Sequence, residues 1–150
     1  MKKGTKQILI TAVVAVIFLV FGVWYPRNSG EQEGIISHNG IHWHPQLEVY
    51  IKGEKQEIPG GIGLIGGHNP MHTHDPDGIV HLEFSGLVRE DDIRLGKFFR
   101  MWGHEFNSEQ VMGHMNGPDG MVHVFVNGEE NFQFENYMMQ HEDKIEIRYE

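Results

Sequence analysis

Histidine is the residue type whose number and spacing in this chain most clearly predict chemistry. The sequence has 11 histidines and no cysteine, and most of the histidines stand in close groups. These groups are His38, His42 and His44; His68, His72, His74 and His81; and His114 and His123. A neutral imidazole is the commonest protein ligand for transition metals, and closely spaced imidazoles can share one ion. The sequence therefore predicts a metal site built without thiolates.

The strongest candidate ligands are His72 and His74, together with His81. Residues i and i+2 of a strand share one face, so an H-x-H pair can hold an ion from a rigid platform. His42 and His44 repeat the pattern upstream. This second pair could form its own surface site or meet the first pair across a sheet. For both pairs, the alternative is a set of solvated surface histidines.

Carboxylates near these histidines could complete or orient the site. Glu83 and Asp75 are candidate fourth ligands. Asp77 and Glu83 are also candidate hydrogen-bond acceptors, which would fix the orientation of a ligating imidazole.

A third candidate group combines thioethers with imidazoles and comprises Met112, His114, Met115 and His123. Thioether and imidazole ligands without thiolate favour copper, and Cu(I) in particular. The alternative is that the methionines fill gaps in the core, which is their commoner role.

A short internal repeat connects the second and third groups. The segment PDGIVH at residues 76–81 recurs as PDGMVH at residues 118–123. If each Pro-Asp-Gly turn closes a tight hairpin, the flanking histidines become cross-strand neighbours. The predicted pairs are His72 with His81 and His114 with His123. A β-bulge would shift each pair by one residue, and chance similarity around a favoured turn is a further alternative.

The elements that must position these residues are mostly short strands between turn signals. Alternating or β-rich runs predict strands at 43–51, 71–74, 79–84, 121–126 and 144–150, with Phe132 and Phe134 on a return strand after Asn127-Gly128. One helix is predicted over 91–106, with Asp91 or Asp92 as its cap and Gly103 as an early end. The expected fold class is α+β, a mostly antiparallel β domain with about one packed helix.

The N-terminal segment predicts a membrane anchor. Ile8–Tyr25 contains 18 residues without a charge, and three lysines precede it. Such a helix is about 27 Å long, enough to span the hydrocarbon core, and the lysines favour a cytoplasmic N-terminus. A cleaved signal peptide is the alternative. The predicted organisation is a cytoplasmic tip and transmembrane anchor at 1–25, a linker at 26–37 and a His-rich extracytoplasmic domain at 38–150, in the periplasm or at the cell exterior.

Charge limits the possible partners. The formal net charge is −9, which disfavours nucleic acid because phosphate binding needs a basic surface. An acidic surface attracts metal cations instead. The absence of cysteine also means that an exported domain would fold without disulfides.

Three stretches carry a resemblance to known proteins: HWHPQLEVYIKGEKQEIP, MHTHDPDGIVHLE and VNGEENFQFENYMMQHEDKIEIRYE. Through them the chain resembles a group of small, membrane-anchored, His-rich extracytoplasmic proteins of bacteria and archaea. The resemblance covers most of the exported domain and implies this architecture, without a specific activity. The C-terminal part is also similar to the closing strands of β-grasp domains. Separately, the spacing of Pro118, Gly120, His123 and Asn127 resembles the second half of the cupin signature.

Three functional hypotheses follow. The first is an anchored metal-binding protein, most simply for copper with zinc as the other candidate, that acts in delivery, buffering or tolerance. Its partner could be a membrane metal transporter or an oxidase. The second is a cupin-like metalloenzyme with an open coordination position. The third is an interaction domain whose histidines sense pH.

Overall fold

The computed structural model describes residues 34–150, which form mostly antiparallel β-sheets with one α-helix. The predicted membrane anchor and most of the predicted linker lie outside the described residues. Within 34–150, no helix combines the length and the apolar character needed to cross a membrane. The compact unit begins at Ile35, so the last three residues of the predicted linker form a strand.

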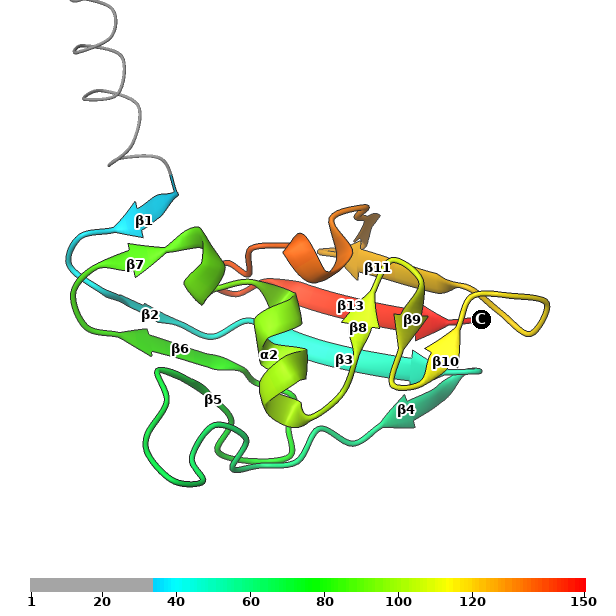
Figure 1. Ribbon diagram of the computed structural model, residues 1–150, viewed down its shortest axis with the longest axis horizontal. Helices are drawn as coiled ribbons and strands as arrows, with labels where there is room; N and C mark the ends of the chain where they lie inside the picture. The colour runs from blue at the N-terminus through cyan, green and yellow to red at the C-terminus, as the bar shows by residue number, and fades with distance from the viewer. Residues whose placement is uncertain (1–33) are drawn as a thin grey trace, which may run out of the picture. The chain divides into compact units, whose positions relative to one another are not determined.

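Thirteen short strands and three helical segments make up the described chain (Figure 1). The strands are β1 (Ile35–Ser37), β2 (Ile41–Trp43), β3 (Gln46–Ile51), β4 (Glu54–Gln56), β5 (Met71–His72), β6 (His81–Phe84), β7 (Val88–Arg89), β8 (Phe106–Asn107), β9 (Gln110–Val111), β10 (His114–Met115), β11 (Val122–Val126), β12 (Glu129–Glu130) and β13 (Lys144–Tyr149). The helical segments are the 3-10 turns η1 (Glu90–Asp92) and η2 (Phe134–Asn136) and the α-helix α2 (Leu95–Trp102).

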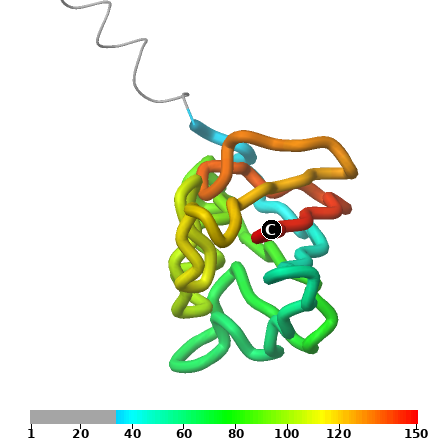
Figure 2. The backbone as a smooth tube through the Cα atoms, turned by 90° about the vertical axis from the view of Figure 1, so that its right-hand side faces the viewer, coloured from blue at the N-terminus to red at the C-terminus, as the bar shows by residue number. Residues whose placement is uncertain are grey.

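The largest sheet has five strands in the order β12-β11-β13-β3-β4. Its central pair, β3 and β13, is parallel, and an antiparallel hairpin completes each side. Figure 2 shows the C-terminal strand running between β3 and β11. Both hairpins turn at two residues with positive φ, Lys52-Gly53 and Asn127-Gly128. Positive φ at both central residues is the geometry of a type I′ turn, and the hairpin at Asn127-Gly128 is the one that the sequence predicted.

One face of this sheet is buried and the other is polar. Leu47, Val49 and Ile147 are fully buried in the core that also contains Phe98 and Phe99 of α2. The alternate residues Glu48 and Glu146 lie on the opposite face. An antiparallel sheet commonly buries one face in this way, so the strand pattern read from the sequence reports the core correctly.

The helix is shorter than the predicted range 91–106. Asp92 accepts a hydrogen bond from the Arg89 backbone N–H at 3.0 Å, which orders η1 rather than the first turn of α2. The backbone is extended at Arg94, so α2 begins only at Leu95. It ends at Gly103, whose φ of +85° is left-handed, as predicted.

The predicted return strand through Phe132 and Phe134 is wrong. β12 ends at Glu130, and Phe132 is 73% exposed. Phe134 instead opens the turn η2 with a positive φ of +47°. The aromatic residues suggested a strand, but the chain leaves the sheet edge after a two-residue pairing.

Gly78 closes the predicted Asp-Pro-Asp-Gly turn and packs directly on the central sheet. Its φ is +82°, and an added Cβ would lie 2.5 Å from the carbonyl oxygen of Leu47. Gly53 has the same φ but open space around it. Gly78→Ala and Gly53→Ala should therefore both incur the left-handed strain of about 1–2 kcal/mol. We expect Gly78→Ala to lose about 1–3 kcal/mol more unfolding free energy than Gly53→Ala, because its added Cβ would clash with the Leu47 carbonyl.

Urea unfolding of the two variants measures this difference directly. Because the backbone strain is matched, equal losses of unfolding free energy would contradict the close approach of Gly78 to β3.

Candidate metal centre

A small three-stranded sheet, β2-β6-β5, brings the two H-x-H pairs to one surface. In its register His72 pairs with His81, and His42 pairs with Glu83. Alternate residues of a strand share a face, so His81 and Glu83 project to the same side of β6, while Leu82 between them is fully buried. The predicted pairing of His72 with His81 is confirmed, and the bulged alternative is not adopted. The tight hairpin itself is not formed, because Ile79 bridges to Gln46 on β3 instead of pairing with His74.

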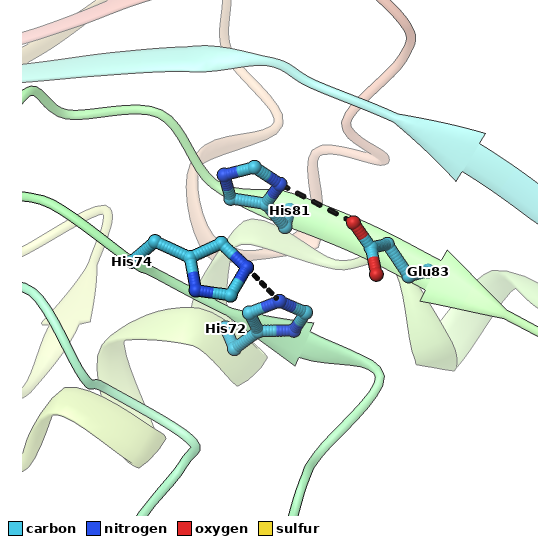
Figure 3. A group of neighbouring side chains, drawn as sticks. All are labelled: His72, His74, His81 and Glu83. Atoms are coloured by element: carbon cyan, nitrogen blue, oxygen red, sulfur yellow. Dashed lines mark hydrogen bonds and ion pairs between the residues drawn. The ribbon is translucent and has the colours of Figure 1, made fainter.

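The inner group consists of His72, His74, His81 and Glu83, whose ligand atoms all lie within 4.8 Å of one another. The Nε2 atoms of His72 and His74 are 3.1 Å apart, and Nδ1 of His81 is 3.4 Å from Oε1 of Glu83 (Figure 3). Ligand atoms on a tetrahedral ion with bonds of about 2.0–2.2 Å lie about 3.3–3.6 Å apart. These two distances are close to the spacing of ligands on a tetrahedral ion, and the whole group converges within 4.8 Å.

His72 is oriented and held neutral by its surroundings. Its ring is fully buried, and Nδ1 lies 2.9 Å from the carbonyl oxygen of Asn69. A carbonyl can only accept, so Nδ1 donates and the lone pair of Nε2 faces the cluster. Burial lowers the pKa of His72, and the nearby imidazoles of His68 and His74 lower it further. A neutral imidazole with one nitrogen anchored to the backbone is the usual form of a metal ligand.

His81 and Glu83 carry the polar groups that most need a partner. The Nδ1 atom of His81 is buried and makes no well-formed hydrogen bond, and its contact with Oε1 of Glu83 measures 3.4 Å. An unsatisfied buried group costs about 1–3 kcal/mol, which a bound ion would offset. For Glu83, burial would raise the pKa, but His42, His72 and His81 outweigh it and lower the pKa. Glu83 is therefore an ionised carboxylate.

The outer group consists of His42, His44 and the same Glu83. Nε2 of His42 lies 3.6 Å from Oε1 of Glu83. The ring of His44 lies 4.8 Å from the rings of both His42 and His81, so the two groups are continuous. Burial lowers the pKa of His44, and the neighbouring histidines lower it further.

Two histidines that were not among the predicted ligands, His68 and His141, also join the cluster. The ring of His68 lies 4.5 Å from that of His72, and Nδ1 of His141 accepts a hydrogen bond from the His44 backbone N–H at 3.3 Å. His44 lies just before β3 and His141 just before β13. Because β3 and β13 pair in parallel, these two histidines are brought together. That pairing is the signal that could have identified His141, and it is not visible in local spacing.

A buried threonine, Thr73, fixes the segment that carries His72 and His74. Thr73 donates its hydroxyl to the Pro59 carbonyl at 2.8 Å and accepts from the Ile62 N–H at 3.1 Å. A Cβ on Gly60 would lie 2.3 Å from the carbonyl oxygen of His74. The glycine-rich loop therefore packs against the backbone behind His72 and His74, where only glycine fits.

The predicted pairing of His114 with His123 is wrong. His114 pairs with Val111 in the β8–β10 meander, and His123 pairs with Arg148 on β13. The ring of His114 lies 5.2 Å from that of Tyr149, on the buried face of the large sheet. His123 alternates with buried residues of β11 and so faces the opposite side, where Nδ1 contacts Glu130 at 3.0 Å.

The methionines of the third predicted group are also apart from the histidine cluster. Met112 packs against the core, and Met115 is 65% exposed on β10. Metal binding by the third group remains a prediction, and the described residues give its histidines no common site. In the cupin-like hypothesis, His123 would share a metal site with His72 and His74. The converging groups do not include His123, so the structure gives no shared site for the cupin-like spacing.

The neutral state of His72 predicts a pH dependence in the metal-free protein. Because its folded pKa lies below the ordinary 6.5, the unfolded chain takes up a proton that the folded chain excludes. The stabilising contribution is complete above pH 6.5 and is lost as the pH falls toward the lowered pKa. One such proton lowers stability by at most about 1.4 kcal/mol per pH unit.

Urea unfolding at about pH 7.5 and about pH 5.5 checks this expectation around the ordinary imidazole pKa. The variant His72→Gln should lose less stability than the wild type between the two pH values. An unchanged slope in the variant would show that His72 is not the group that titrates.

No family model matches the chain, and no curated protein or solved structure matches it. The chemistry of the cluster is therefore the basis for inferring a function. Clustered imidazoles with an ionised carboxylate form a nitrogen and oxygen ligand set. Such a set could hold a divalent transition-metal ion that is neither strongly hard nor strongly soft.

Proposed function

We propose that this protein binds a transition-metal ion through the inner group. The convergence of His72, His74, His81 and Glu83 supports the proposal most directly, because four ligand atoms lie within 4.8 Å of one another. The buried nitrogen of His81 without a hydrogen-bond partner is a second observation in its favour. The same four residues supply a neutral, anchored imidazole and a carboxylate, which are the forms that ligate metals.

The ligand set favours Cu(II) or Zn(II). Three imidazoles and one carboxylate suit both ions, and Cu(II) binds more tightly than Zn(II) to a given nitrogen and oxygen site. The inner group as defined consists of imidazoles and a carboxylate, which suit Cu(II) better than Cu(I). We therefore propose copper(II) as the first candidate, with zinc as the alternative.

The biological role that fits such a site is metal delivery, buffering or tolerance. If residues 8–25 anchor the chain with its N-terminus in the cytoplasm, the cluster stands outside the cytoplasm at the membrane surface. A membrane metal transporter or oxidase would then be the natural partner. The formal net charge of −9 favours the capture of cations in this setting.

Competitive metal titration of the full chain tests the proposal. The protein must carry no histidine tag and must first be stripped of metal with a chelator. We expect stoichiometric Cu(II) and Zn(II) binding with dissociation constants well below micromolar, with Cu(II) the tighter. If no site is tighter than about micromolar, or about −8 kcal/mol, the proposal fails, and pH-dependent partner binding becomes the hypothesis to pursue.

A further inference from the structure

We propose that the cluster binds two metal ions, with Glu83 as a ligand shared between them. This inference rests on the proposed function: the inner group holds the first ion, and His42 and His44 hold the second. Glu83 belongs to both groups of converging ligand atoms, which is the observation that distinguishes a paired site from two separate ones.

The carboxylate of Glu83 stands between the two sets of imidazoles. Its Oε1 atom is 3.4 Å from Nδ1 of His81 in the inner group and 3.6 Å from Nε2 of His42 in the outer group. Both distances are close to the ligand spacing expected on a single ion. A carboxylate has two oxygens with about four lone pairs, so it can ligate two ions at once.

Strand register explains why the two sets are adjacent. His42 pairs with Glu83 across β2 and β6, and His72 pairs with His81 across β5 and β6. Because β6 is the middle strand of the small sheet, its two outward residues each have imidazoles beside them. The ring of His44 lies 4.8 Å from that of His81, which closes the gap between the sets.

The two ions should differ in affinity. His72 is fully buried and His81 is 20% exposed at its side chain, whereas His42 is 68% exposed. The outer ion also has fewer described carboxylate and imidazole ligands in its group. We therefore expect the inner ion to bind first and the outer ion to bind more weakly and exchange more readily.

Zinc titration of the full chain with three variants tests the shared site. Wild type should bind two ions per chain, and His42→Ala with His44→Ala should bind one, with the tighter affinity changed less than about threefold. Glu83→Gln should weaken both ions by about 10–100-fold. Glu48→Gln is the matched control, because its side chain has the same 30% exposure on another sheet, and it should change neither affinity.

Electron paramagnetic resonance of the copper(II)-loaded protein tests adjacency. Two copper ions that share a carboxylate should couple magnetically, so the uncoupled signal should fall well below the copper content. A wild-type stoichiometry of one, or two ions with a full uncoupled signal, would overturn the shared site and leave the proposed function intact. Absence of tight binding in the wild type would overturn both.

Discussion

Replacement of His72 and His74 together by alanine should weaken the tightest zinc site by about 10⁴-fold. Structural zinc sites with four ligands are stabilised by about 10–16 kcal/mol, or about 3 kcal/mol for each ligand. Each lost ligand then costs about 100-fold in affinity, since 1.4 kcal/mol corresponds to tenfold. The two imidazoles belong to the inner group, with Nε2 atoms 3.1 Å apart, so removing both leaves half of its ligands.

The matched control is the double variant His114→Ala and His123→Ala. It removes the same number of histidines, but His123 lies on β11 of the large sheet and His114 on β10 of a separate sheet, and neither belongs to the two groups. Its tightest affinity should stay within about twofold of the wild type, because distant sites act independently. Competition against a chromophoric chelator measures both variants. Equal losses in the two would mean that affinity reflects the total number of histidines, not the inner group.

The parts of the fold that sequence predicts well are those set by local turn chemistry. Lys-Gly and Asn-Gly each close a two-residue hairpin with positive φ at both central residues, and Asp-Pro-Asp-Gly lies in the longer loop between β5 and β6. The register of His72 with His81 is one of the two that the Pro-Asp-Gly turn left open, and the pairing of β5 with β6 ends at these two residues. All four residues of the inner group were candidate ligands in the sequence, whereas their convergence with His42 and His44 was one of two open alternatives.

The repeat of Pro-Asp-Gly shows where local similarity stops being informative. The second copy also makes a turn, with a bridge between Gly117 and Gly120. Beyond it, β11 pairs with β13 because Val122 and Val124 are buried on the same face as Ile147 and Tyr149. Burial of these four side chains outweighs the pairing that the short repeat suggested.

Long-range pairing also explains what was missed in the site. His44 and His141 are separated by 97 positions and meet because β3 and β13 are parallel neighbours. Parallel strands have no hairpin turn between them, so no short motif reports their contact. The suggested similarity to β-grasp domains remains a prediction, and the central parallel pair is the feature most relevant to it.

Saturating zinc should raise the free energy of unfolding by about 4 kcal/mol at a free concentration 1,000 times the dissociation constant. The gain arises because the ion binds the folded state and not the unfolded chain. His72 and His81 are nine positions apart in sequence and are held together only by the pairing of β5 with β6. When the sheet unfolds, the four ligands of the inner group separate and the ion is released.

Urea unfolding with and without zinc measures this gain for the wild type and for the His72→Ala, His74→Ala double variant. Loss of the buried His72 ring can itself lower stability, so the relevant quantity is the increment that zinc adds to each protein. We expect the increment to fall to near zero in the double variant and to remain in the His114→Ala, His123→Ala control. An increment that survives the loss of His72 and His74 would place the stabilising ion elsewhere. A zinc-induced loss of stability in the wild type would show that the unfolded chain is the better ligand.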